Sequence, residues 1–410
     1  MNSGDTAWVL MSTALVLLMT IPGLAFFYGG LVRRKNVLSI LMQCFIILCV
    51  ISIQWVLFGY SLAFGPDFHG IIGNLNFAGL RGVGPIPNQD YAATIPHSVF
   101  MIFQRMFAVI TPALIIGAYA ERVKFPAFLL FTILWATFVY DPLAHWVWGT
   151  GGWLKNLGAL DFAGGIVVHV SSGISALILA LLLGKRVGYN HKPIRPHNLP
   201  FTVLGGALLW FGWFGFNAGS ALAADGIAAN AFITTNTATA AAGLTWALIE
   251  WWHNGSPTIL GTVTGAVAGL VAITPACGFV NPVNAIFIGI IVATVCYLAV
   301  AVIKGKIGYD DSLDAFGVHG VGGTVGTIAT GLFAEKAVNA AGNNGLLFGN
   351  AHQLYVQSLS LLVAVAFAVI MTFIIFKIVD ALVGMRVEEK NEIVGLDLTQ
   401  QSEAAYTVIE

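Results

Sequence analysis

Long apolar runs separated by short loops constrain this chain more than any other feature. A membrane-spanning helix needs roughly 20 mostly apolar residues, and charges, prolines and glycines divide the chain into eleven such segments. Only 9% of the 410 residues are charged and 58% are hydrophobic, whereas soluble domains are about 25% charged. Lipid is therefore the expected solvent. The predicted spans are 7–30, 38–63, 96–118, 125–145, 163–184, 199–220, 228–252, 258–276, 282–303, 313–333 and 351–383.

The composition also argues against several classes of function. A net charge of −1 offers no basic face for nucleic acid. The cysteines lie in apolar stretches, which is typical of small packing residues and not of a disulfide set or a metal cluster. We find no nucleophile–base set and no cofactor-binding loop, so an enzyme, a cofactor and a metal site are not expected. The cysteines are Cys44, Cys49, Cys277 and Cys296.

The basic residues predict the orientation, because Lys and Arg concentrate in cytoplasmic loops. An outside N-terminus puts fourteen of the eighteen basic residues inside and leaves Arg81, Arg105, Lys155 and Lys336 outside. We expect a multi-pass protein of the cell membrane with its N-terminus outside and its C-terminus in the cytoplasm. The fourteen are Arg33, Arg34, Lys35, Arg122, Lys124, Lys185, Arg186, Lys192, Arg195, Lys304, Lys306, Lys377, Arg386 and Lys390.

An inverted repeat is the predicted architecture within a transmembrane domain of residues 1–383. Five spans precede the basic loop at 185–198, and five follow it before the last span. Two halves with an odd number of spans cross the membrane in opposite directions, as in many transporters. The halves are about 1–184 and 199–333, and the span at 351–383 is an extra C-terminal helix. We therefore predict an all-α integral membrane fold with a polar tail at 384–410.

Two histidines occupy matching positions in the repeat. The fifth span opens with Asp161 and reaches His169 after seven residues, and the tenth opens with Asp311 and reaches His319 in the same way. Eight helical residues cover roughly 12 Å, and the hydrocarbon core is roughly 30 Å thick. Since the two spans start from opposite sides, both imidazoles should reach nearly the same depth, close to the midplane.

A single histidine in a span is more often a structural residue, hydrogen-bonded to a neighbouring helix, than part of a transport pathway. Two at matching repeat positions favour a pathway, because intramembrane ionisable residues are costly. A zinc site is not expected, since it needs three or four ligands and no third histidine lies in a span at this depth.

Aromatic residues gather toward the predicted outer ends of three spans. Phe103 and Phe107 lie four apart on one face of the third span, Trp148 follows the fourth, and the sixth ends in residues 213–220, Trp-Phe-Gly-Phe-Asn-Ala-Gly-Ser. Aromatic rings can bind a cation through their π faces. The alternative is an interfacial aromatic belt, which position alone favours.

Four motifs together resemble ammonium transporters of the Amt/Mep type, from the first span to the tail. The resemblance implies the ammonium transporter fold of eleven spans with a pseudo-twofold repeat. It also implies a homotrimer in membrane lipid with one pore per subunit, and ammonium and methylammonium as substrates. The motifs are residues 161–169, 213–220, 274–278 (Thr-Pro-Ala-Cys-Gly) and 316–323 (Phe-Gly-Val-His-Gly-Val-Gly-Gly).

The resemblance also implies roles for the aromatic residues. Phe107, Trp148 and Ser220 match the outer ammonium-recruiting site of the family, with Phe103 beside them. Phe107 and Phe216 match its stacked phenyl gate. These matches turn the aromatic cage from the weaker interpretation into the expected one.

The remaining matches lie along the pore. His169 and His319 match the paired pore histidines, Trp213 matches a ring that lines the path, and Asp161 matches the buried carboxylate near the outer site. The expected mechanism removes a proton from ammonium near the outer site, passes ammonia through the apolar pore and handles the proton separately. Asp161 either acts on the cation by its charge or accepts backbone N–H groups at the start of the span.

The tail at 384–410 contains 392–397 (Glu-Ile-Val-Gly-Leu-Asp) and 403–406 (Glu-Ala-Ala-Tyr). It resembles the family's regulatory tail, which packs under neighbouring subunits and helps to dock a PII-type signal protein. Gln401 and Ser402 depart from the family pattern, which often has His-Gly there. The alternative is a solvated, partly disordered end.

Two other functions compete with ammonium transport. A Rhesus-type channel for neutral ammonia or carbon dioxide is disfavoured by Trp148 and Ser220, because a neutral gas needs no cation site. A sensor with its own signalling domain is not expected, since the 27 residues of 384–410 leave no room for one. A sensor that acts through a PII partner stays open.

Overall fold

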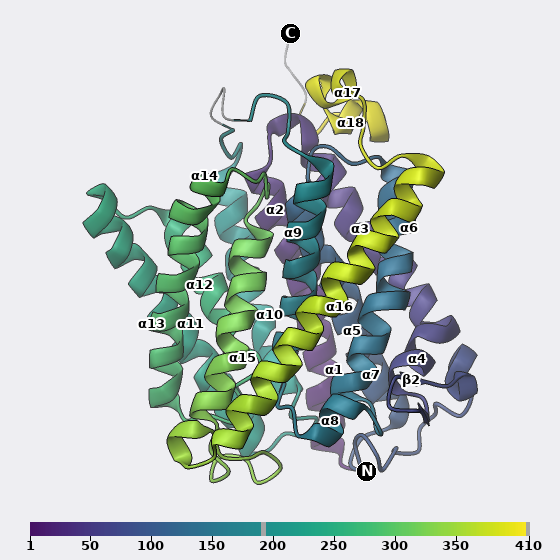
Figure 1. Ribbon diagram of the computed structural model, residues 1–410. Helices are drawn as coiled ribbons and strands as arrows, with labels where there is room; N and C mark the ends of the chain where they lie inside the picture. The colour runs from purple at the N-terminus through teal and green to yellow at the C-terminus, as the bar shows by residue number, and fades with distance from the viewer. Residues whose placement is uncertain (190–193, 407–410) are drawn as a thin grey trace.

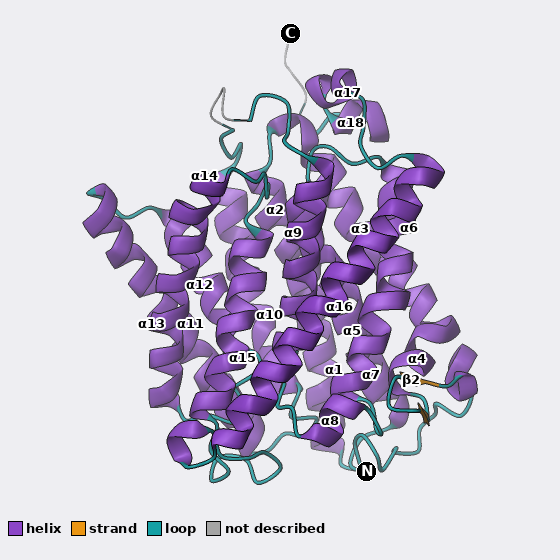
Figure 2. Ribbon diagram, viewed as in Figure 1, coloured by secondary structure: helices purple, strands orange, loops and turns teal. Residues whose placement is uncertain are grey.

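The computed structural model describes residues 1–189 and 194–406 as a bundle of helices (Figures 1 and 2). Lys192, one of the predicted inner cations, and residues 407–410 of the predicted tail lie outside the described residues. Most helices run between two faces, which we call the N-terminal face and the tail face after the chain ends that they carry (Figure 1). The only strands in the described ranges are β1 (Asp67–Phe68) and β2 (Ile72–Gly73), an antiparallel pair.

All eleven predicted spans are helical, and their observed ends lie within four residues of the predicted ones. Several spans join an α-helix to a π-helical turn. The first half contains α1 (Ser3–Leu18) with α2 (Ala25–Leu31), α3 (Val37–Gln54) with α4 (Tyr60–Phe64), α5 (His97–Tyr119), α6 (Phe125–Trp135) with α7 (Asp141–Trp148), and η6 (Gly165–Val170) with α9 (Ser171–Leu183). The second half contains α10 (Leu199–Gly219), α11 (Gly226–Asn254), α12 (Ile259–Ile273), α13 (Pro282–Tyr297) with α14 (Lys304–Ile307), and η8 (Phe316–Gly320) with α15 (Val321–Phe333), followed by α16 (Ala351–Val383).

Eight of the helical segments are long and apolar enough to cross a membrane by themselves. The other three are α11, α12 and the segment formed by η8 and α15. Helix α12 has only 15 residues, α11 carries many threonines, and α15 is rich in glycine. Helices α12 and α15 have almost no exposed residues, and a helix covered by other helices needs less apolar surface than one that faces lipid.

The fifth and tenth spans, the last of each half, begin with the same hydrogen-bonding arrangement. Asp161 accepts hydrogen bonds of 2.5–3.1 Å from four backbone N–H groups that lead into η6. Asp311 accepts bonds from the N–H groups of Ala315, at 3.1 Å, and Phe316, at 2.8 Å, at the start of η8. These N–H groups have no partner within the helix, and lipid cannot supply one. Two roles were expected for Asp161. The structure shows one of them, the acceptance of hydrogen bonds from backbone N–H groups at the start of the span.

The fifth and tenth spans also cross at backbone contact. Gly173 follows His169 by four residues, and Gly323 follows His319 by four residues. A Cβ atom on Gly173 would overlap the backbone of Gly320, and one on Gly323 would lie 3.0 Å from the carbonyl oxygen of Gly165. Such close crossings depend on small residues. They bring the two histidine-bearing segments together inside the bundle.

Charged side chains form a buried network at the tail face. Arg186 pairs with Asp310 at 2.8 Å and with Glu121 at 3.1 Å. Arg122 also reaches Asp310, and Arg33 reaches Glu121. Burial alone would raise the pKa of Asp310, but the Arg186 guanidinium outweighs it and holds that pKa below its ordinary value. The network joins the segments that follow α2, α5 and α9 to the one that precedes η8.

The described part of the tail packs against this network. It forms α17 (Glu389–Val394) and α18 (Leu396–Gln401) above the bundle (Figure 1). The buried carboxylate of Glu392 accepts bonds from the N–H of Val187, at 2.6 Å, and from Arg386, at 3.0 Å. Asp397 accepts one from the N–H of Ser39, at 2.8 Å. The described part of the tail is thus docked and is not a solvated end.

The close crossing predicts a specific loss of stability. Gly173→Ala should lower the free energy of unfolding by about 1–3 kcal/mol, because its methyl group has no room beside Gly320. Thermal unfolding of the purified protein in detergent would measure it. Gly305→Ala is the matched control, since a Cβ atom there meets no described atom within 4 Å. Equal melting temperatures for both variants would contradict the close backbone contact between Gly173 and Gly320.

Candidate functional site

A cavity of about 400 Å³ at the N-terminal face contains the predicted recruiting residues. Phe107, Trp148 and Ser220 all contribute to its lining, although they come from α5, the end of α7 and the end of α10. Residues that the sequence analysis did not single out as a site complete much of the wall. They include Tyr91, Gln104, Lys155 and Phe279.

The aromatic rings of the cavity are in direct contact. The edge of one ring meets the face of the other between Phe107 and Trp148, with centroids 5.8 Å apart and planes at 83°. The hydroxyl of Ser220 donates to the carbonyl oxygen of Phe216 at 2.8 Å, so its oxygen remains able to accept another hydrogen bond. The cavity thus presents π faces and a hydroxyl acceptor to a small cation.

Phe103 lies behind the cavity and outside its lining. Its ring is fully buried and meets the ring of Phe107 at 5.1 Å, with planes at 70°. It therefore supports Phe107 from behind. Trp148 is also held in place, because its indole N–H donates to the backbone carbonyl oxygen of Asp161 at 2.8 Å.

Two phenyl rings lie in contact below the cavity. The centroids of Phe107 and Phe216 lie 4.4 Å apart with planes at 35°, and both side chains are buried. His169 follows, with its ring centroid 6.0 Å from that of Phe216. Trp213 lies almost parallel to His169 at 5.4 Å and 16°, and its indole N–H donates to Thr274 at 2.9 Å. The rings therefore continue directly from the phenyl pair to the histidine.

The two histidines meet, as the repeat predicts. Their rings are nearly parallel at 13°, and the two Nδ1 atoms are 3.3 Å apart. At this separation one Nδ1 can donate a hydrogen bond to the other. The Nε2 of His169 is buried and has no hydrogen-bond partner within 1–189 and 194–406. It therefore keeps an unused hydrogen-bonding position.

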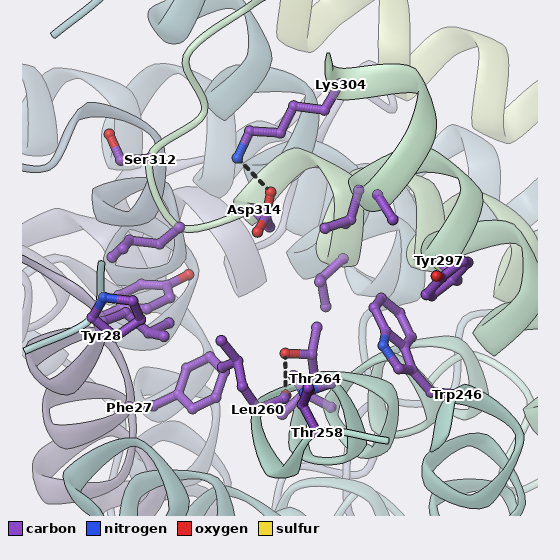
Figure 3. A pocket seen from close by; sticks show the side chains of 18 of the residues that line it. Phe27, Tyr28, Trp246, Thr258, Leu260, Thr264, Tyr297, Lys304, Ser312 and Asp314 are labelled. Atoms are coloured by element: carbon purple, nitrogen blue, oxygen red, sulfur yellow. Dashed lines mark hydrogen bonds and ion pairs between the residues drawn. The ribbon is translucent and has the colours of Figure 1, made fainter. Parts of the chain in front are cut away.

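A second cavity, of about 690 Å³, approaches the histidines from the tail face, with His319 in its wall (Figure 3). An ion pair of 2.6 Å between Lys304 and Asp314 crosses this cavity, and Tyr28 and Trp246 stand on opposite sides of it (Figure 3). Sequence reasoning missed this cavity, because its wall comes from segments far apart in the chain with no shared spacing. The phenyl pair and the histidine pair thus lie between two cavities that approach from opposite faces.

Known proteins resemble the chain along nearly its full length. The model of the Ammonium Transporter Family matches residues 7–406. An ammonium transporter of Bacillus subtilis is 57% identical over 406 residues, with 99% of each chain covered. Ammonium transporter Amt1 of Archaeoglobus fulgidus is 52% identical over 408 residues, which covers 99% of this chain and 100% of that one.

Solved structures match as well. The crystal structure of Saccharomyces cerevisiae Mep2 superposes with a TM-score of 0.89 at 38% identity and covers 94% of this chain and 88% of that one. The structure of a Sensor Amt Protein superposes with a TM-score of 0.89 at 31% identity and covers 97% and 98%.

The contacts of Asp161 predict a difference between two substitutions. Asp161→Ala removes the acceptor of four backbone N–H groups and should lower the free energy of unfolding by about 1–3 kcal/mol or more. Asp161→Asn keeps one acceptor oxygen and should lose less. Thermal unfolding of both variants checks the order. Equal losses would show that the backbone contacts of Asp161 do not stabilise the fifth span.

Proposed function

We propose how this chain, which belongs to the ammonium transporter family, moves its substrate through the membrane. Ammonium binds in the cavity at the N-terminal face, loses a proton there and crosses as neutral ammonia past His169 and His319. The observation that carries the proposal is the pair of cavities separated by two phenyl rings in contact and by the paired histidines.

The cavity offers ammonium what a compact cation needs when it leaves water. The rings of Phe107 and Trp148 supply negative π faces, and the oxygen of Ser220 accepts one of its four N–H groups. Phe103 supports Phe107, and Asp161 lies behind Trp148 as a buried carboxylate. Its charge acts on the bound cation in addition to holding the backbone. Methylammonium offers three N–H donors and a small methyl group, so the same cavity accepts it.

The segment below the cavity disfavours a charge. Transfer of an unpaired cation into an apolar interior costs many kcal/mol, and the path past Phe107 and Phe216 is lined by rings. Loss of a proton near Trp148 removes that cost. Ammonia then passes between the phenyl rings, which gate the path, and hydrogen-bonds to the free Nε2 of His169. The proton travels separately, and an imidazole suits such a relay because one ring nitrogen can accept a proton while the other gives one up.

The assembly and its control form a second part of the proposal. The subunit sits in the cell membrane with its N-terminus outside, because most of its basic residues lie toward the tail face. Three subunits form a homotrimer with one pore each. The tail, 384–410, is the regulatory segment, and its docked carboxylates Glu392 and Asp397 support this role. A PII-type signal protein binds at the tail face. The likeness to the Sensor Amt Protein makes sensing through such a partner the second candidate function.

The histidine pair is tested by recording ammonium-evoked current in proteoliposomes. His169→Leu combined with His319→Leu should reduce the proton-linked, ammonium-selective current at least about tenfold, because the path loses both hydrogen-bonding rings. His352→Leu, at an exposed histidine of the N-terminal face, is the control and should keep the current. An unchanged ammonium-selective current in the double variant would refute the role assigned to the pair.

Regulation is tested by pulling down purified PII protein with the purified transporter. The intact protein should bind it, and a chain that ends at Gly384 should bind it much more weakly. Gel filtration of both proteins shows whether the shortened chain still forms the trimer. If the intact trimer retains no PII protein in any ligand state of that protein, the regulatory proposal fails.

A further inference from the structure

A lysine side chain already occupies the mouth of the N-terminal-face cavity. Lys155 lies on the short helix α8 (Trp153–Leu157) and contributes to the wall of the cavity. Its ammonium group donates to the backbone carbonyl oxygen of Trp148 at 3.0 Å. The same nitrogen lies 5.8 Å from the ring centroid of Tyr91, over its face. It thus makes one hydrogen bond and one cation–π contact within the space proposed for the substrate.

Both partners of this lysine are held in place by other contacts. The ring of Tyr91 stacks on Phe100 at 4.9 Å and 13°. Its hydroxyl donates to the carbonyl oxygen of Phe64 at 2.8 Å and accepts from the N–H of Thr150 at 3.1 Å. The carbonyl of Trp148 belongs to the last residue of α7, where helix carbonyls lack partners within the helix and carry partial negative charge. The two groups therefore form a fixed receptor for a cation with N–H donors.

Lys155 and ammonium are chemically alike at this receptor. Each is a nitrogen cation that donates hydrogen bonds and interacts with an aromatic face. Trp148 connects the two positions directly, since its carbonyl holds Lys155 and its indole forms part of the ammonium cage. A cation bound at the cage therefore lies close to the charge of Lys155.

We propose that the carbonyl of Trp148 and the face of Tyr91 form a cation subsite that Lys155 occupies as a tethered ammonium group, and that its charge lowers the affinity of the cage for ammonium. This inference rests on the proposed function of the cavity. Like charges about 10 Å apart change an affinity by a factor between about two, at the dielectric constant of water, and about fifteen, at the effective dielectric constant near a protein surface. Asp90 also contributes to the wall and offsets part of this repulsion.

The test compares variants of Lys155 in proteoliposomes. We would measure the ammonium concentration that gives half-maximal current, at about 10 mM and about 300 mM ionic strength, because salt screens the repulsion. Lys155→Met, which keeps the length without the charge, should lower this concentration about two- to fifteenfold at low salt and far less at high salt. Lys155→Arg should behave like the wild type. The control is Lys336→Met, in the loop between α15 and α16 and outside the cavity wall, which should change nothing.

Three results would overturn the inference: no shift in Lys155→Met at low salt, an equal shift in Lys336→Met, or a shift that high salt leaves unchanged. The last result would mean that Lys155 supports the Trp148 backbone without acting through charge. Equilibrium binding of radiolabelled methylammonium to the same purified proteins gives the affinity ratio without any current. A wild type that binds the label but carries no current would refute transport, while the binding ratio would still decide the role of Lys155.

Discussion

A hydrocarbon environment supplies no hydrogen bonds and strongly disfavours charge, and the main features of this molecule follow from that constraint. Its charged residues concentrate at the two faces, where those at the tail face pair in a buried network around Arg186. Inside the bundle, Asp161 and Asp311 accept backbone N–H groups that would otherwise lack partners. The histidines at the centre pair with each other through their Nδ1 atoms. Each of these side chains thus makes at least one polar contact with the protein, although the Nε2 of His169 has no partner among the described residues.

The inverted repeat places these partners with few residues. Each half supplies an aspartate, a histidine eight residues later and a glycine four residues after that. Gly173 and Gly323 allow the two segments to touch at their backbones, and this contact puts the imidazoles side by side. The contact between the two histidines therefore depends on a crossing that a single added methyl group would disturb. Since each segment opens with a π-helical turn that carries its histidine, the two halves share local geometry as well as sequence.

The sequence predicted the features that depend on local pattern. Apolar runs located the spans, and the paired Asp and His spacing located His169 and His319 at one depth, which the structure confirms. Spacing alone favoured an interfacial belt for Phe107 and Trp148, whereas the structure places both rings in a cavity wall.

Features that depend on contacts between distant segments escaped the sequence analysis. The cavity at the tail face and the pairing of Arg186 with Glu121 and Asp310 have no periodic signature. One sequence feature did single out Lys155: it is among the four basic residues that the predicted orientation places outside. That exception marked the lysine without indicating its contact with Trp148.

The central claim is that the cavity and the pore select ammonium and reject a cation that cannot give up a proton. Current recording on proteoliposomes that contain the purified protein, under alternating pulses of ammonium and potassium, tests it most directly. The account predicts a current with ammonium, a smaller one with methylammonium and none with potassium, because only the first two can lose a proton at the cage and cross as neutral molecules. Equal currents with ammonium and potassium would contradict it.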